Sequence, residues 1–225
     1  MRKHPKNNFV FLLVGLLFLF ALLPLLHQFS GEQLEVDLLR ALLLVGFSLF
    51  IVISVWSLYR ERLIFRVGLG LAGLNIAISI AELLFPSHII ELCAILLVMG
   101  FSMLSCFIAG RHVFSWRETD ANSLTGAVCV YLLLGLIWAL VYHGLSALWP
   151  TGLFQGLPTQ GKGVYLDDFL YFSFVTLTTA GYGDITPVNP VVKMIVYMEI
   201  ITGQFYMAIL VSGLVAHFMG QRLSR

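Results

Sequence analysis

The chain has 225 residues, of which 59% are hydrophobic and only 11% carry charge, and its mean hydropathy is +0.93. Soluble domains of this length contain fewer apolar and more charged residues, so this composition excludes a water-soluble protein and favours an integral membrane protein. The formal net charge of +1 gives no reason to expect a nucleic-acid partner.

Six apolar blocks are each long enough to cross a membrane as a helix, which takes about 20 residues. In chain order these blocks are residues 8–26, 38–58, 63–85, 89–109, 124–148 and 191–218. An eleven-residue apolar segment, 168–178, lies between the fifth block and the sixth. A helix of that length is too short to cross, and it fits a re-entrant helix that is buried in protein or lines water. The sequence therefore predicts an all-α integral membrane protein with six transmembrane helices and one re-entrant helix.

The distribution of Lys and Arg predicts the orientation of the chain in the membrane. With a cytoplasmic N-terminus, ten of the 13 basic residues fall on the inner side. The other three, Arg40, Lys162 and Lys193, fall on the outer side. We therefore expect both termini to be cytoplasmic and the short apolar segment to enter from the outer face of the plasma membrane.

The first four blocks, within residues 1–110, are expected to form a four-helix membrane domain, followed by a cytoplasmic interfacial linker at residues 111–123. Voltage sensing needs several charges that cross the membrane field, each worth about 2.3 kcal/mol per 100 mV. The fourth block, 89–109, contains no Arg or Lys. We therefore expect that this domain does not sense voltage through a charged helix.

The segment TLTTAGYGDITP, residues 176–187, begins in the last three residues of the re-entrant helix and continues toward the last block. A backbone that replaces the water shell of a cation must aim successive carbonyl oxygens at one axis. Alternating left- and right-handed conformations achieve this, and glycine adopts the left-handed one without a Cβ penalty. Gly181 and Gly183 stand at the required alternate positions. Because the chain carries one such segment, a closed ring of oxygens requires several identical subunits around an axis.

The stretch TLTTAGYGD resembles the signature of the potassium channel family, Thr-x-x-Thr-x-Gly-Tyr-Gly-Asp. In that family an outer helix, a pore helix, a selectivity filter and an inner helix form the pore domain, and residues 124–225 have this order. The resemblance implies a homotetramer around a central pore, with K⁺ as the bound and permeant ion and no further cofactor. It also implies that residues 1–110 correspond to a sensor domain, here without its arginine repeat.

The same resemblance assigns roles to individual residues. The filter comprises five consecutive residues, and K⁺ binds to the carbonyl oxygens of the first four: Thr179, Ala180, Gly181, Tyr182 and Gly183. Asp184 stands at the outer mouth of the pore. Three residues of the pore helix support the filter: Tyr171, Phe172 and Thr178. We expect the Tyr182 ring to turn away from the pore, toward the two aromatic rings among them.

Two positions depart from the family's pattern. Ala180 replaces the usual Val or Ile, so a smaller side chain packs against the pore helix and the filter is expected to be less rigid. Val175 replaces a Glu that some members pair with the filter Asp, so Asp184 is expected to lack that partner.

The last block carries the candidates for the gate. Gly203 comes 20 residues after Gly183, where the family has a hinge glycine, although a glycine also allows close helix packing. Four residues at three- and four-residue spacing either line the cavity and gate or contact lipid and other helices: Gln204, Met207, Val211 and Val215. Glu199 is an acid deep in a span, either a functional carboxylate or a buried residue that is hydrogen-bonded behind the filter.

These features predict a K⁺-selective channel that conducts passively. The alternatives are a weakly selective cation channel, the ion-conducting subunit of a coupled uptake system and a non-conducting membrane scaffold. Tyr182 argues against the first alternative, the single filter motif against the second and the intact filter against the third. The histidines and carboxylates form no pattern of nucleophile and base or of metal ligands, so we do not expect an enzyme.

Overall fold

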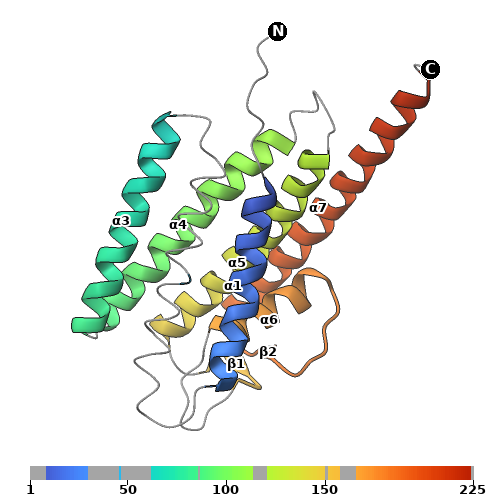
Figure 1. Ribbon diagram of the computed structural model, residues 1–225. Coiled ribbons are helices and arrows are strands. Elements are labelled where there is room, and N and C mark those ends of the chain that lie inside the picture. Colours follow the sequence, from blue (N-terminus) through green and yellow to red (C-terminus); the bar gives the residue numbers. More distant parts are fainter. Residues whose placement is uncertain are drawn as a thin grey trace. The chain divides into compact units, whose positions relative to one another are not determined.

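The described part of the chain is almost entirely helical (Figure 1). The computed structural model describes residues 9–29, 46, 62–85, 87–113, 121–149, 152–157 and 166–223. Its helices are α1 (Phe9–Phe29), α3 (Arg62–Leu84), α4 (His88–Val113), α5 (Ala121–Leu148), α6 (Leu166–Leu177) and α7 (Pro190–Leu223). Its strands are β1 (Phe154–Gln155) and β2 (Thr186–Pro187). The predicted second block, 38–58, falls outside the described residues except for Gly46, and so does most of the predicted linker.

Three helices are long and apolar enough to span a membrane, His88–Arg111, Asn122–Leu148 and Pro190–Gly213. They coincide with the fourth, fifth and sixth predicted blocks, and their composition is that of a membrane protein. α1 and α3 contain shorter apolar stretches, Phe9–Leu25 and Arg66–Ala81, at the places of the first and third blocks. The arrangement with six spans therefore stays a prediction.

The chain folds as two compact units. The first contains α1, α3, α4 and the beginning of α5 as far as Leu133. The second contains the rest of α5, the two strands, α6 and α7. The division thus falls within α5, whereas the sequence places the start of the pore domain at residue 124. Because α5 is one continuous helix of 28 residues, it contributes to both units.

Small and aromatic side chains hold the first unit together. α3 packs on α4, and it buries a stripe of small side chains at three- and four-residue spacing: Ala72, Asn75 and Ser79. The start of α1 is bound to the first turns of α5, because the N–H of Phe9 donates to Oδ1 of Asn122 at 3.1 Å. Gly126 leaves room for the Phe9 ring, since a Cβ there would lie 3.0 Å from its Cδ2 atom.

An aromatic cluster forms the core of the second unit. Four ring contacts, with centroids 5.2 to 5.7 Å apart, connect these side chains: Tyr142, Phe154, Phe169 and Phe172. Tilted and edge-to-face pairs of this kind contribute about 0.5–1.5 kcal/mol each beyond their buried area. Since the rings come from α5, β1 and α6, the cluster fixes α6 against the other two elements.

A short helix precedes the glycine-rich loop. α6 has twelve residues, so its length of roughly 18 Å falls well short of the ~30 Å membrane core. Two aspartates in its first turn complement the positive end of the helix dipole. β1 pairs antiparallel with β2, with Phe154 opposite Pro187. The chain before α6 is therefore tied to the chain that follows the loop.

Candidate functional site

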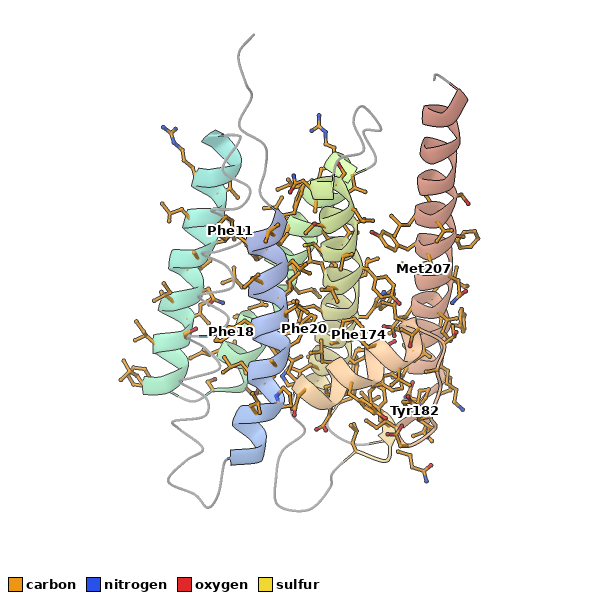
Figure 2. The ribbon with its side chains drawn as sticks, turned by 45° about the vertical axis from the view of Figure 1, so that its right-hand side comes forward. Phe11, Phe18, Phe20, Phe174, Tyr182 and Met207 are labelled. Carbon is orange, nitrogen blue, oxygen red and sulfur yellow. The ribbon has the colours of Figure 1, made fainter. Side chains whose placement is uncertain are left out.

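The loop from Thr178 to Asp184, which joins α6 to β2, has an alternating backbone conformation; Tyr182 marks it in Figure 2. The φ angle is 59° at Thr179, 57° at Gly181 and 82° at Gly183. Every second residue is thus left-handed, which turns successive carbonyl oxygens toward one side of the loop. The left-handed conformations expected at Gly181 and Gly183 are present.

Thr179 is the third left-handed residue, and its side chain makes that conformation costly. Residues with a Cβ lose about 1–2 kcal/mol there, and β-branched residues adopt it rarely. Two local hydrogen bonds hold it in place. The N–H of Thr179 donates to the carbonyl oxygen of Thr176 at 2.9 Å, and its hydroxyl donates to the carbonyl oxygen of Thr178 at 2.7 Å. The alternation consequently starts earlier than the glycines alone predict.

The loop is anchored on the C-terminal end of α6. The N–H of Ala180 donates to the carbonyl oxygen of Val175 at 2.9 Å. The N–H and the hydroxyl of Thr178 both donate to the carbonyl oxygen of Phe174, at 3.0 and 2.6 Å. These bonds satisfy carbonyl groups that the end of a helix leaves without an intrahelical partner. Thr178 thus lies at the junction between helix and loop, where a supporting role is expected.

A tyrosine and a carboxylate meet at the outer end of the loop. The hydroxyl of Tyr171 donates to Oδ2 of Asp184 at 2.7 Å, and its ring stacks on Tyr182 with centroids 6.5 Å apart and planes 13° apart. The hydrogen bond from Tyr171 lowers the pKa of the Asp184 carboxyl below its ordinary value. Val175 offers no carboxyl to Asp184, as expected, and Asp184 accepts instead from Tyr171, which lies one turn before Val175 on α6.

Phe172 takes a different place from its neighbour. Its ring is buried and packs against Tyr142 and Phe154 in the aromatic cluster. Successive residues of a helix point about 100° apart, so Tyr171 and Phe172 do not both face the Tyr182 ring. Within the chain, the support that Phe172 gives to the loop is indirect and acts through the position of α6.

A glycine after β1 also touches the loop. Gly156 has a φ angle of 91°, and a Cβ at this position would collide with the carbonyl oxygen of Asp184. No side chain fits into that space, so the backbone before α6 lies directly against the backbone at the outer end of the loop. The sequence gives a weak signal for this contact, because 28 positions separate the two residues.

α7 carries a buried carboxylate that has hydrogen-bond partners. The side chain of Glu199 is fully buried, and its Oε2 accepts the hydroxyl of Tyr142 at 2.6 Å. Its Oε1 lies 2.5 Å from Oγ of Ser173. Of the two interpretations open for Glu199, the structure shows the buried, hydrogen-bonded one. Because Tyr142 and Ser173 belong to α5 and α6, the carboxyl joins three helices.

Comparison with known proteins matches residues 126–219 to the family model described as ion channel. The chain is 44% identical to two pore potassium channel c of Oryza sativa subsp. japonica over 52 residues, 23% of this chain and 11% of that protein. It is 28% identical to two-pore potassium channel 4 of Arabidopsis thaliana over 103 residues, 46% and 36% of the two chains. It is 24% identical to the voltage-gated potassium channel Kch of Escherichia coli (strain K12) over 183 residues, 81% and 40% of the two chains. Residues 126–219 are therefore an ion channel domain, and the chain is similar to potassium channels.

The matched ion channel domain includes every element that shapes the loop. The matched segment begins within α5 and ends within α7, so it contains the aromatic cluster, α6 and the glycine-rich segment. The family and the apolar helices together identify a membrane protein, and they point to a channel rather than an enzyme. The chain spans between 11% and 40% of the length of these three relatives.

One glycine of α7, Gly203, allows a close approach between helices. A Cβ at Gly203 would lie 2.6 Å from the carbonyl oxygen of Leu177 and 2.9 Å from its Cδ1 atom. α7 reaches the end of α6 because residue 203 has no side chain. The helix continues through Gly203 without interruption, so a hinge at this residue stays a prediction.

The candidate cavity residues lie further along α7. Three of them are exposed on the single chain: Gln204, Met207 and Val211. Figure 2 labels Met207 on this helix. Val215 also belongs to α7, but its side chain is outside the described part of the chain. A role of these residues in the cavity or gate stays a prediction.

Proposed function

We propose that this protein is a K⁺-selective channel with Thr179–Gly183 as its selectivity filter. The observation that carries the proposal is the alternation of left-handed residues along this segment. In such a backbone, consecutive carbonyl oxygens replace the hydration shell of a K⁺ ion. The ions would bind at the carbonyl oxygens of Thr179, Ala180, Gly181 and Tyr182. Asp184 would stand at the outer mouth, where its charge attracts cations. K⁺ is the one ligand that the proposal requires.

We infer that the working channel is a homotetramer around a central pore. The loop is exposed in the single chain, with Tyr182 73% exposed, so that each chain offers one side of a ring. α7 also exposes apolar side chains such as Phe205, at 65%, which lipid or neighbouring subunits would cover.

The arrangement that we propose in the membrane keeps six transmembrane helices. Residues 1–110 would form a four-helix domain, residues 111–123 a cytoplasmic interfacial linker and residues 124–225 the pore domain. The protein would lie in the plasma membrane with both termini in the cytoplasm, which the bias of Lys and Arg supports.

The proposed channel is not gated by voltage through α4. Arg111, near the end of the helix, is its one Arg or Lys. A single charge at the membrane boundary gives no steep dependence on a potential that contributes about 2.3 kcal/mol per charge and 100 mV. The word voltage-gated in the name of one relative is said of that protein.

Ion flux through liposomes that contain the purified chain tests these proposals. We expect K⁺ flux that Ba²⁺ blocks and that changes little between membrane potentials. Gly181→Ala should abolish it, because alanine at a φ of 57° costs about 1–2 kcal/mol in each subunit. Gly100→Ala on α4, where nothing lies within 4 Å of the added Cβ, is the matched control and should conduct like the parent chain.

The outcomes separate the alternatives. Equal flux of Na⁺ and K⁺ would favour the weakly selective cation channel, for which the small side chain of Ala180 offers a reason. A parent chain that conducts no ion at any potential would contradict conduction and favour the membrane scaffold. Flux that persists in Gly181→Ala would contradict the assignment of the filter.

A further inference from the structure

Three helices of the second unit are joined by a row of buried oxygen atoms, called the oxygen relay below. The hydroxyl of Tyr142 on α5 lies 2.6 Å from Oε2 of Glu199 on α7. Oε1 of Glu199 lies 2.5 Å from Oγ of Ser173 on α6. The same Oγ lies 2.9 Å from the carbonyl oxygen of Gly135, back on α5. All four residues are buried.

The number of hydrogen atoms that the oxygen relay needs indicates whether Glu199 is protonated. Each of the three contacts needs one hydrogen between its two oxygens. The hydroxyls of Tyr142 and Ser173 supply two hydrogens, and the carbonyl of Gly135 supplies none. With an ionised Glu199, one pair of acceptors would face each other without a hydrogen, and a charge would be buried as well. Both are strongly unfavourable.

A proton on Oε1 of Glu199 completes the set. Glu199 then donates to Ser173, Ser173 donates to the carbonyl oxygen of Gly135, and Tyr142 donates to Oε2. We infer that Glu199 is a neutral carboxylic acid in the folded channel and acts as a positioning residue for α6. The inference rests on the proposed function only in treating the loop after α6 as a filter.

The surroundings of the carboxyl group agree with a neutral acid. α5 presents Tyr142 to it and α6 presents Ser173, and within the described ranges no Lys, Arg or His lies within 4.0 Å of Glu199. The other titratable residues nearby on these helices make no described contact with it: His143, Asp167, Asp168, Tyr171, Lys193 and Tyr197. The strands β1 and β2 contain no titratable side chain.

The proton affects α6 because Ser173 then binds two helices at once. With Glu199 protonated, Ser173 accepts from α7 and donates to α5. When the proton leaves, the single hydrogen of Ser173 serves either Glu199 or Gly135, and α6 loses one of its two attachments. Ser173 lies two residues after Tyr171, which holds Asp184 at the outer end of the filter loop.

Infrared spectroscopy of the full chain in lipid bilayers tests the proton directly. A protonated carboxylic acid shows a C=O stretching band that is separate from the bands of a carboxylate. We expect this band in the parent protein at neutral pH and its loss in Glu199→Gln. Glu91→Gln, at a side chain on α4 that is 43% exposed, is the matched control and should leave the band unchanged. A band of equal intensity in the parent and in Glu199→Gln would overturn the inference.

Ser173→Ala covers the case in which Glu199→Gln does not fold. This variant removes the acceptor of the Glu199 proton, so the band should move to higher frequency. A band at an unchanged frequency would mean that Ser173 does not accept from Glu199 and would overturn the relay.

The dependence of the melting temperature on pH tests the positioning role. Gln accepts from Tyr142 and donates to Ser173, so Glu199→Gln retains the relay without a proton that titrates. The folded parent binds one more proton than an unfolded chain with ionised Glu199, so its stability falls as pH rises. We expect this fall to begin near the ordinary pKa of a glutamate and to end at the pH where the infrared band disappears, with a smaller fall in Glu199→Gln. Equal falls would overturn the role of Glu199. None of these readouts requires conduction, so a silent channel leaves the test intact.

Discussion

At the scale of single residues, the hydroxyl of Tyr171 affects the charge of Asp184, at the outer end of the loop that we propose as the filter. It is the main cause that lowers the pKa of the Asp184 carboxyl. The hydrogen bond favours the ionised form of Asp184. The carboxylate is therefore present at neutral pH, and its charge is lost as pH falls through the lowered pKa. We expect Tyr171→Phe, which keeps the ring that stacks on Tyr182, to raise the pKa of Asp184. Acid inhibition of K⁺ flux should then have its midpoint at a higher pH.

A second tyrosine supplies the control for this measurement. Tyr197 lies on α7 and is 49% exposed, and no described hydrogen bond joins it to Asp184. Tyr197→Phe removes the same hydroxyl group and should leave the midpoint where it is in the parent chain. Identical midpoints in Tyr171→Phe and Tyr197→Phe would show that the hydrogen bond does not set the charge at the pore mouth.

At the scale of elements, the contact between α6 and α7 depends on Gly203. Alanine there would bring its Cβ to 2.6 Å from the carbonyl oxygen of Leu177, and backbone cannot move aside as a side chain can. We expect Gly203→Ala to lower the free energy of unfolding by about 1–3 kcal/mol, the usual cost of overpacking. Thermal or denaturant unfolding in detergent measures this effect.

Gly100→Ala is the matched helical control for Gly203→Ala. Nothing lies within 4 Å of a Cβ at Gly100, and alanine favours helix over glycine by up to about 1 kcal/mol. The control should therefore be as stable as the parent chain or slightly more stable. Equal stability of the two variants would contradict the close approach at Gly203 and leave the hinge as its better explanation.

The elements around the filter could be predicted from the sequence, and their contacts could not. Apolar blocks and an eleven-residue segment predicted the helices α4 to α7 closely, because length and composition are local properties. The left-handed conformations of Gly181 and Gly183 were predictable from the lack of a Cβ. The left-handed conformation of Thr179 could not be predicted. Residues with a Cβ disfavour it, and hydrogen bonds to Thr176 and Thr178 outweigh that preference.

The hydrogen-bond partners of Glu199 and Asp184 could not be predicted from the sequence either. Glu199 meets Ser173 and Tyr142 from positions 26 and 57 residues away, and such distances along the chain carry no local pattern. Tyr171 and Asp184 are closer, 13 residues apart, but the turn of the loop decides whether they meet. The position of α6 in the fold therefore determines these contacts, and composition and periodicity do not predict that position.

At the scale of the whole molecule, the proposed ring of four filters makes a prediction about mass. A homotetramer of 25.1-kDa chains has a protein mass of about 100 kDa. We expect this mass from native mass spectrometry or light scattering in detergent, with chemical cross-links that stop at four chains. A monomer or a dimer as the largest species would contradict the proposed closed ring, since one chain supplies one copy of the loop.

The contact between Gly156 and the carbonyl oxygen of Asp184 restricts how this chain can diverge. Any residue larger than glycine at position 156 would enter the space of that oxygen and displace the outer end of the proposed filter. A substitution there is tolerated only together with a shift of the backbone at the pore mouth. As descendants of this chain drift apart, we expect position 156 to change as slowly as the filter glycines themselves. A motif search confined to the filter would miss this third fixed glycine.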